Sequence, residues 1–366
     1  MRTGRHSDYV MFFCLGFLVI FGLIMLASAS SNLGRVRYDD AYYYLKHQIL
    51  FGFSLGLVGF FTATRVNYHT YARISFIALL ISIVFLILVF TPFGVTANNS
   101  ARWLAFGPIR FQPAELLKIT LIFYLASWFS GDARRKHFAG RGLLPLLLIV
   151  GTVAFLLLKQ PSTSTVAILI IAALAMYFVS GAKMKHIFLL GAIALLALVI
   201  ITIITPYRFE RIKTFLNPNS EVSGGGFHIN QARIAIGSGG LFGVGFGNGT
   251  AKLGYLPEPV GDSIFAIIAE ELGFVGSFVL VSIFLLLVLR IYLVARRAPD
   301  SFGELLLIGF GTIIAVQAIV NISAISGLLP LTGTPLPFIS YGGTALAVFM
   351  TIGGICINVS KYARHG

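Results

Sequence analysis

Apolar residues occur in long runs along most of this chain, and polar residues gather in the segments between them. A run of roughly 20 apolar residues can cross the hydrocarbon core of a bilayer as a helix. The pattern predicts an all-α, polytopic integral membrane protein. Its ten transmembrane helices are expected at 10–30, 46–64, 73–91, 114–130, 143–158, 165–181, 186–205, 263–289, 304–328 and 338–359.

The composition supports a membrane protein. Hydrophobic residues make up 57% of the chain and charged residues 11%, with a mean hydropathy of +0.90. A soluble domain is about 25% charged. We expect a single integral domain over 1–366. The first apolar run lacks a convincing small-residue cleavage site, so it is interpreted as a retained first span.

Basic residues indicate the orientation of the chain. Lys and Arg favour the cytoplasmic side in short loops. With the N-terminus inside, the inner connections carry pairs such as Lys183 with Lys185 and Arg296 with Arg297. Ten spans return the C-terminus to the same side. We therefore predict that both termini are cytoplasmic.

The predicted outer segments carry an unexpected number of basic residues, and the chain has a net charge of +14. The surplus favours an anionic partner at the outer face, although contact with lipid headgroups would also explain it. Nucleic-acid binding is not expected, because the charge otherwise follows membrane topology. The outer basic residues include Arg35, Arg37, Lys46, Arg208 and Arg211.

Three predicted outer loops are long or irregular. The first covers 92–113, and the large one, about 206–262, lies between the seventh and eighth spans. The large loop opens with PYRFERIKTFLNP, whose apolar spacing predicts an amphipathic surface helix. The third, 327–343, holds three prolines and paired glycines, so a straight helix is not expected there. Irregular backbone at that depth must be covered by protein or line a watery cavity.

Carboxylates cluster at the end of the large loop. The chain has 13, and Glu258, Asp262, Glu270 and Glu271 fall within one short stretch. An ionisable residue at a membrane boundary is by default a functional candidate. Asp262 is the strongest catalytic candidate, although its place before an apolar helix also suits a structural N-cap. At most one of the adjacent Glu270 and Glu271 is expected to face a cavity.

A second polar group lies in and before the fourth span. Glu115 and Lys118, spaced i and i+3, share one helix face and can pair there. They form either a structural ion pair or the polar wall of a cavity entered from outside. Arg102 and Arg110 precede them, and a guanidinium suits bidentate phosphate binding.

Other polar features are weaker candidates. The glycine-dense run 237–249 contains a GxGxxG-like pattern without a surrounding βαβ unit, so we expect a compact loop rather than a nucleotide site. Gln317 and Asn321 are interpreted as polar contacts between helices. Cys14 and Cys356 lie in apolar spans, and neither the cysteines nor the histidines have metal-ligand spacing. No metal site is predicted.

Four segments resemble the shape, elongation, division and sporulation (SEDS) family, whose members include FtsW, RodA and SpoVE. They are NNSARWLAFGPIRFQPAELLK, KQPSTST, NQARIAIGSGGLFGVGFGNGTAKLGYLPEPVGDSIFAIIAEELGFVG and QAIVNISAISGLLPLTGTPLPFISYGG. They occur in family order and cover the chain almost from end to end. The stretch AYYYLKHQILFGFSLGLVGFFTATRVNY is more similar to division-type FtsW than to elongation-type RodA.

The resemblance implies a peptidoglycan glycosyltransferase of the bacterial cytoplasmic membrane. Such an enzyme polymerises lipid II into glycan strands at the outer face, here in septal synthesis during cell division. Asp262 would be the essential carboxylate and act as general base, with a polyprenyl pyrophosphate as leaving group. The substrate-binding candidates are Glu115, Lys118, Arg102, Arg110, Arg233, Lys252, Glu258 and Ser340.

The resemblance also implies partners. These are lipid II, a polyprenyl-pyrophosphate-linked glycan, a class B penicillin-binding protein as transpeptidase, other divisome proteins and membrane lipids. A divalent cation, Mg²⁺ or Mn²⁺, could help the pyrophosphate leave, but the sequence offers no dedicated carboxylate cage.

Two departures from the family pattern keep alternatives open. The family usually has Gln-Pro-Asp after the fifth span, and this chain has Gln160-Pro161-Ser162. The usual Thr-Asp-Phe is Gly261-Asp262-Ser263 here. A catalytically weak scaffold that activates a penicillin-binding protein is therefore one alternative. A lipid II flippase is the other, because polar groups inside a bundle also suit translocation.

Overall fold

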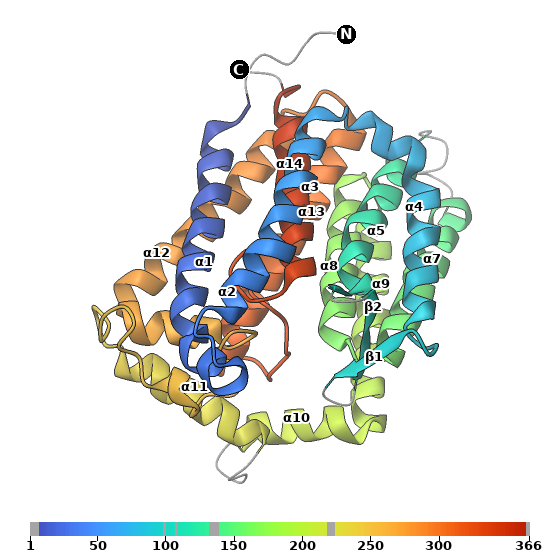
Figure 1. Cartoon of the computed structure of the whole chain (residues 1–366). Coiled ribbons are helices and arrows are strands. Elements are labelled where there is room, and N and C mark those ends of the chain that lie inside the picture. Colours follow the sequence, from blue (N-terminus) through green and yellow to red (C-terminus); the bar gives the residue numbers. More distant parts are fainter. Residues whose placement is uncertain (1–6, 98–99, 107–108, 132–138, 218–223, 364–366) are drawn as a thin grey trace.

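The computed structural model describes residues 7–97, 100–106, 109–131, 139–217 and 224–363. Within these ranges the chain is mostly helical, and its long helices form one bundle (Figure 1). The chain termini, which were predicted to be cytoplasmic, lie outside the described residues at 1–6 and 364–366.

Every predicted span overlaps a helix, and most boundaries agree within a few residues. The second span is composite: α2 (Tyr43–His47), η1 (Gln48–Phe53) and α3 (Ser54–Arg65) follow one another without a break. The other helices are α1 (Tyr9–Tyr38), α4 (His69–Leu88), α5 (Pro113–Ser130), α7 (Ala139–Lys159), α8 (Thr163–Val179), α9 (Met184–Ile204), α12 (Ile264–Ala295), α13 (Ser301–Ile325) and α14 (Gly343–Ser360).

In the described part of the chain, 7 helices are long and apolar enough to cross a membrane, and α8 and part of α7 are shorter apolar helices. The helix α5 falls outside this set and carries the charged pair Glu115 and Lys118. Many large apolar side chains on the outside of the bundle are exposed, as expected for surfaces that face lipid. The structure is that of a multi-pass membrane protein.

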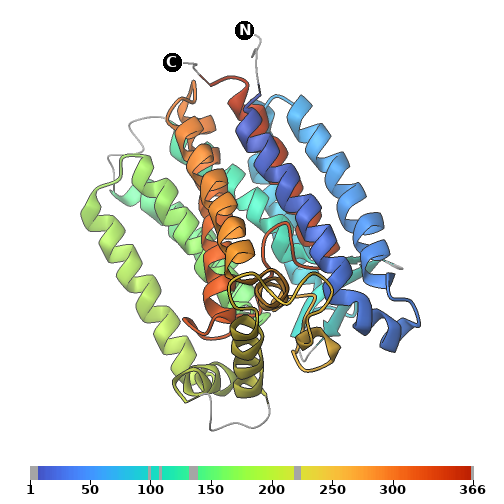
Figure 2. The same ribbon diagram turned by 90° about the vertical axis from the view of Figure 1, so that its left-hand side faces the viewer.

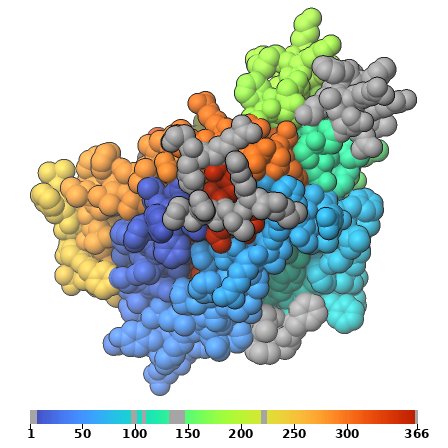
Figure 3. Space-filling view, turned by 90° about the horizontal axis from the view of Figure 1, so that it is seen from above, coloured from blue at the N-terminus to red at the C-terminus, as the bar shows by residue number. Residues whose placement is uncertain are grey.

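Among these 7 helices α13 and α14 are the most buried, and they lie at the centre of the bundle. The helix α13 packs against α5, α8 and α12, and α14 packs against α3. Viewed from the end at which α1 begins, α14 lies among α1, α3 and α13 (Figure 3). The two ends of the described bundle meet there, because the N–H of Asp8 donates to Ser360 Oγ (3.1 Å).

The prediction of an all-α chain is wrong for the first outer loop. Strands β1 (Gly94–Ala97), β2 (Ser100–Phe106) and β3 (Ile109–Phe111) form a small antiparallel sheet in the order β1-β2-β3. Leu104 is opposite Gly94 on one side and Phe111 on the other. The loop of 92–113 contains short alternating segments such as IRF, and these pair with one another instead of joining the helical bundle.

The large loop after α9 contains two helices. The predicted surface helix is present as α10 (Pro206–Leu216), and Pro206 occupies its first turn, where a missing N–H costs nothing. A second helix, α11 (Gly225–Ser238), packs against α12. Both lie at the end of the bundle opposite the start of α1 (Figures 1 and 2).

The glycine-dense run folds as a compact loop on α12, as predicted. The helix α12 is interrupted at Gly273, whose φ of 66° lies in the left-handed region. At Gly243 an added Cβ would lie 2.1 Å from the carbonyl oxygen of Glu271, so that position requires glycine. The loop replaces the helical hydrogen bonds lost at the break, through Val244 N to Glu270 O, Gly245 N to Glu271 O, Phe274 N to Gly240 O and Val275 N to Leu241 O.

Glu270 and Glu271 both secure this loop. Glu270 accepts from the backbone N–H groups of Thr250 and Ala251 at 2.7 and 3.2 Å. Glu271 pairs with Lys252 at 2.6 Å. Both carboxylates are buried, and neither lines one of the cavities described below. This agrees with the expectation that at most one of them faces a cavity, because the loop uses both as acceptors.

The pair Lys252–Glu271 connects three elements. Lys252 Nζ also donates to Ser28 Oγ of α1 (2.8 Å) and to the carbonyl of Gly247 (2.7 Å). Breaking one partner of a buried pair leaves an uncompensated charge and costs about 3–5 kcal/mol. We expect Lys252→Met to lower the melting temperature in detergent strongly, as followed by intrinsic fluorescence.

Two controls accompany this prediction. Asp40→Asn breaks the solvent-exposed pair Lys46–Asp40 and should leave the melting temperature almost unchanged. Replacing both buried partners, as Lys252→Met with Glu271→Leu, should recover part of the loss. Equal melting temperatures for Lys252→Met and Asp40→Asn would contradict the structural role.

Candidate functional site

The loop of residues 257–262, here the PEPVGD loop, leads into α12 and separates the cavities at this end of the bundle. Its backbone is held by the segment before α14, since the N–H of Tyr341 donates to the carbonyl of Val260 (2.8 Å). Inside the loop, Gly261 donates to the carbonyl of Glu258 (3.0 Å). Glu258 has a φ of 48°, which is uncommon for a residue with a side chain.

Asp262 is held by its backbone while its carboxylate faces a cavity. Asn321 Nδ2 donates to the Asp262 carbonyl (2.8 Å) and to the Thr334 carbonyl (2.7 Å). The carboxylate lines a cavity of about 710 Å³ beneath α10 and α11. Its Oδ1 is enclosed and accepts no hydrogen bond within the described residues. The residue precedes the N-cap, which is Ser263, so Asp262 is not the structural cap.

Burial raises the pKa of the Asp262 carboxyl to about 7, and the nearby negative charge of Glu258 adds to the rise. Arg211 opposes it in part. Desolvation penalises a charged carboxylate, and a second carboxylate does the same. A general base works best with a pKa near the working pH. A large share of the molecules then carries the deprotonated base, and that base still binds a proton strongly enough to remove one from a substrate.

His228 of α11 lies in the same cavity and is held neutral. Burial, with a smaller contribution from Arg211, lowers its pKa to about 4. Its Nε2 is 2.6 Å from Ser263 Oγ, and that hydroxyl donates to the carbonyl of Pro257 (2.8 Å). A hydroxyl has one proton to donate, so His228 Nε2 is the donor in their bond. This chain of hydrogen bonds joins α11 to both ends of the PEPVGD loop.

The helix α10 supplies a cation to this cavity. Arg211 donates from Nη1 to the carbonyl of Leu331 (3.0 Å) and from Nη2 to the hydroxyl of Tyr207. Arg211, Tyr207 and Glu210 all line the cavity of Asp262. The predicted amphipathic helix therefore forms one wall of the cavity in addition to lying on the surface.

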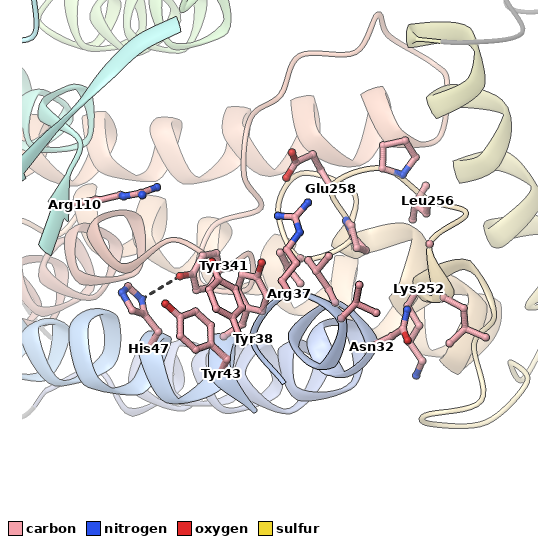
Figure 4. A pocket seen from close by; sticks show the side chains of 18 of the residues that line it. Asn32, Arg37, Tyr38, Tyr43, His47, Arg110, Lys252, Leu256, Glu258 and Tyr341 are labelled. Atoms are coloured by element: carbon pink, nitrogen blue, oxygen red, sulfur yellow. Dashed lines mark hydrogen bonds between the residues drawn. The ribbon is translucent and has the colours of Figure 1, made fainter. Parts of the chain in front are cut away.

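A larger cavity, of about 1020 Å³, lies on the other side of the PEPVGD loop. We call it the aromatic cavity, because Tyr38, Tyr43, Tyr44, His47 and Tyr341 form much of its wall (Figure 4). The same cavity is lined by the charged residues Arg37, Arg110, Lys252 and Glu258.

A groove of about 540 Å³ lies beside the aromatic cavity along α3, α5 and α14. Its walls are mostly apolar and include Leu55, Leu116, Ile119, Ala347 and Val348. The groove adjoins the aromatic cavity, since both are lined by His47, Phe51, Arg110, Glu258, Val260 and Tyr341. An apolar groove beside polar cavities suits a molecule with a hydrocarbon tail and a polar head.

The three spaces meet at the PEPVGD loop. Gly261 lines the groove, and the next residue, Asp262, lines the cavity beneath α10 and α11. Pro257 lines both that cavity and the aromatic cavity. A single loop therefore separates the candidate base from the groove and from the aromatic cavity.

Glu115 and Lys118 are brought together as predicted. Lys118 Nζ is 2.8 Å from Glu115 Oε1 and 2.7 Å from Gln317 Oε1. Gln317 in turn donates to the carbonyl of Pro335 (2.9 Å). Both charged side chains are buried, and neither lines the three cavities. These contacts are structural, and the role in substrate binding stays a prediction.

Arg102 is engaged with backbone. Its Nε donates to the carbonyl of Gln160 (2.9 Å), and its Nη2 donates to the carbonyl of Pro161 (2.6 Å). The turn after α7 is therefore stabilised by an arginine, and Ser162 Oγ adds a bond to Thr165 Oγ1 (2.9 Å). In this chain the turn keeps its place without a carboxylate at position 162.

Three further candidates also contact protein atoms. Arg233 Nη2 donates to the carbonyl of Gly327 (3.0 Å). Ser340 Oγ accepts from the N–H of Leu336 (2.8 Å), so its hydroxyl closes a turn. Lys252 is paired with Glu271, although it also lines the aromatic cavity. Of the predicted site residues, those that line the cavities are therefore Asp262, Glu258, Arg110 and Lys252.

In the described ranges no group of three His, Cys, Asp or Glu side chains could hold a metal ion. Asp262 and Glu258 lie in one loop but line different cavities. The donor set of the described residues therefore does not provide a metal site by itself.

The chain is a multi-pass membrane protein, in which irregular loops and polar cavities are gathered at one end of a helical bundle. The FtsW/RodA/SpoVE family model, described as "Cell cycle protein", matches residues 8–365. This chain belongs to that family.

Relatives match over the whole length. The chain is 36% identical to stage V sporulation protein E of Bacillus subtilis over 100% of both proteins. It is 37% identical to a probable peptidoglycan glycosyltransferase FtsW of Geobacter sp. strain M18, over 100% of this chain and 99% of the relative.

Solved structures show the same fold. One belongs to a study of how a peptidoglycan synthase complex coordinates polymerization and crosslinking. It matches with a TM-score of 0.79 and 26% identity, over 97% of both chains. The rod shape determining protein RodA of Thermus thermophilus matches with a TM-score of 0.70 and 26% identity, over 97% of this chain and 96% of RodA.

The sequence did not identify Arg211, His228 or the ring cluster as cavity residues. The ring cluster consists of Tyr38, Tyr43, Tyr44, His47 and Tyr341. Arg211 was noted only as part of the outer charge surplus. The run Tyr42-Tyr43-Tyr44 next to Lys46 and His47 was a usable signal, because three adjacent tyrosines are unusual at the start of a membrane span. His228 had no local signal, since its partner Ser263 is 35 positions away.

The raised pKa of Asp262 is directly measurable. We expect a carboxylic-acid carbonyl band in infrared difference spectra that disappears with a midpoint near pH 7, because the group is protonated below that pH and charged above it. Asp262→Asn should lack the band. Glu258→Gln should move the midpoint to lower pH, since it removes a negative charge that raises the pKa. A midpoint near pH 4 would contradict the assignment.

Proposed function

We propose that this chain is a peptidoglycan glycosyltransferase. It polymerises lipid II into glycan strands at the outer face of a bacterial cytoplasmic membrane, in septal synthesis during cell division. The observation that carries the proposal is the carboxylate of Asp262, which has a pKa of about 7 and lies one residue from an apolar groove. The name of the FtsW relative from Geobacter supports the same activity.

Both substrates of such an enzyme carry an isoprenoid tail and a polar head. The apolar groove along α3, α5 and α14 suits the tail of one substrate. The polar cavities on either side of the PEPVGD loop suit heads that carry sugars and phosphates. Holding two reactants in one place removes much of the entropic cost of their meeting.

The proposed reaction is a single displacement. Asp262 takes the proton from the sugar hydroxyl of the acceptor, and the hydroxyl oxygen forms a bond to the anomeric carbon of the donor. The bond from that carbon to the pyrophosphate oxygen breaks at the same time, and its electron pair leaves with the polyprenyl pyrophosphate. The α-linked donor gives a β-linked product without a covalent enzyme intermediate.

Negative charge that develops on the leaving pyrophosphate requires a cation nearby. Arg211 is placed for this role, because it lines the cavity of Asp262. Arg110 lines both the groove and the aromatic cavity. Glu258 faces the same two spaces and, through its charge, helps to keep the pKa of Asp262 high. Binding roles are also proposed for Glu115, Lys118, Arg102, Arg233, Lys252 and Ser340. Each of these side chains also bonds another group of the protein, and through these bonds they stabilise the site.

The topology of the proposal has ten membrane crossings, with both termini in the cytoplasm and the loop of about 206–262 outside. The meeting of Asp8 with Ser360 supports an even number of crossings, because it brings both ends of the bundle to one side. The cavities lie at the opposite end, near α10 and α11.

The proposed partner is a class B penicillin-binding protein, which would crosslink the new strands within the divisome. A solved structure of similar fold comes from a peptidoglycan synthase complex that joins polymerization and crosslinking. A divalent cation, Mg²⁺ or Mn²⁺, would have to arrive with the pyrophosphate, since the described residues provide no cluster to hold it.

The enzyme is preferred to the flippase because of where the cavities lie. A flippase needs a polar path across the bilayer. The two polar cavities and the groove that meet at the PEPVGD loop all lie at one end of the bundle. The scaffold alternative rested on the missing aspartate at position 162, and Arg102 stabilises that turn here.

Asp262→Asn should abolish polymerisation of lipid II, because the amide cannot accept the proton. Activity should fall by at least 100-fold. The assay uses fluorescent lipid II and the purified protein, with and without a class B penicillin-binding protein. The exposed Asp40→Asn is the matched control and should retain activity. Near-normal glycan synthesis by Asp262→Asn would refute the base role.

Arg211→Met should lower kcat by about 100-fold, since it removes a cation that stabilises the leaving group. Lys213→Met is the comparison, because that cation lies on the same helix, is exposed and does not line the cavity of Asp262. Melting temperatures of both variants show whether a loss reflects unfolding. If Lys213→Met lowered kcat as much as Arg211→Met, the assignment of Arg211 would be wrong.

A further inference from the structure

The aromatic cavity has a wall that the proposed chemistry does not use. Four tyrosines and one histidine line it, and they come from the end of α1, from α2 and from the segment before α14. Rings from three separate segments converge on one space of about 1020 Å³ (Figure 4).

The rings hold one another in place. Tyr38 and Tyr43 are stacked, with centroids 3.7 Å apart and planes 10° from parallel. Tyr44 meets Tyr341 edge to face at 5.1 Å. The hydroxyl of Tyr341 is 3.0 Å from His47 Nδ1. A wall in which the rings are already ordered loses little entropy when a ligand packs on it.

Charged groups complete the cavity. Arg37 comes from the last turn of α1, Arg110 comes from β3, and Glu258 comes from the PEPVGD loop. Figure 4 shows Arg37 and Glu258 on the same side of the ring cluster. Flat apolar faces beside donors and acceptors suit a sugar ring, which has apolar C–H faces and a rim of hydroxyls. Arginine side chains suit carboxylate or phosphate groups on such a ligand.

We propose that the aromatic cavity is a saccharide-binding site, in which the head of one lipid-linked substrate packs against Tyr43. This rests on the proposed function, and it adds the part of the substrate that the cavity recognises. The adjoining apolar groove supports it, because a tail in the groove brings the attached sugar close to the rings. The site is distinct from the cavity of Asp262, which lies across the loop.

A cysteine-protection experiment tests the site directly. The native Cys14 and Cys356 are both buried, so a maleimide should label an introduced cysteine selectively. Leu253 lines the aromatic cavity and is 54% exposed, whereas Tyr255 is 61% exposed and lines none of the three cavities. The probe is the lipid-free disaccharide pentapeptide of lipid II, added to purified full-length protein.

The disaccharide pentapeptide should slow the labelling of Leu253→Cys at least fivefold and leave Tyr255→Cys unchanged. Adding Tyr43→Ala to Leu253→Cys should raise the half-protecting concentration on the order of tenfold, the scale of one aromatic contact. Tyr43→Phe should protect like the parent, because it keeps the ring. Unchanged labelling of Leu253→Cys at millimolar probe, or equal protection of both cysteines, would overturn the proposal. So would protection that does not change in Tyr43→Ala.

The outcome separates this inference from the proposed activity. Adding Asp262→Asn to Leu253→Cys should leave protection intact, since the carboxylate lies in another cavity. Protection without polymerisation by the parent protein would refute the activity and keep the saccharide site. Polymerisation without protection would refute the site and keep the activity.

Discussion

Irregular backbone inside an apolar bundle must have its polar groups satisfied by protein, and this constraint shapes the end of the molecule that carries α10 and α11. The segment between α13 and α14 is not helical, yet it enters the core. Gln317 and Asn321 bond the carbonyls of Pro335 and Thr334. Gln48 bonds Ser340 and Gly342, and Arg211 bonds Leu331. These side chains come from α13, η1 and α10, so the segment connects helices that barely touch otherwise.

The same requirement positions the candidate base. Asn321 holds the backbone of Asp262 as well as that of Thr334, and Tyr341 holds the backbone of Val260. The PEPVGD loop is therefore attached to the segment before α14 on one side and to α13 on the other. These contacts hold Asp262 in a buried position, and burial is the largest cause that raises its pKa to about 7. The support of the loop and the reactivity of the site are therefore connected.

Local patterns predicted what depends on neighbours in sequence. Apolar runs located the long helices, and the spacing in PYRFERIKTFLNP located α10. The i, i+3 spacing predicted the pair of Glu115 with Lys118. The sheet of β1–β3, the role of Arg102 and the ring cluster escaped prediction. The role of Arg102 and the ring cluster depend on contacts between distant residues, such as Arg102 with Pro161 or Tyr44 with Tyr341, which no periodicity encodes. The sheet pairs strands that are neighbours in sequence, but β1 and β3 have only 4 and 3 residues, too few for a clear alternation.

The π-helical stretch η1 places the ring cluster relative to α3. A π-turn accommodates an extra residue, so it offsets the two halves of a helix by one position, or about 100° of rotation. Tyr43 and Tyr44 precede this offset, and the face of α3 that packs on α14 follows it. Because the π-turn holds one extra residue, loss of one residue between Gln48 and Phe53 would convert it into an α-turn and keep the tyrosines facing the cavity. Loss of a residue from α3 itself would instead rotate the tyrosines by about 100° relative to the face that packs on α14.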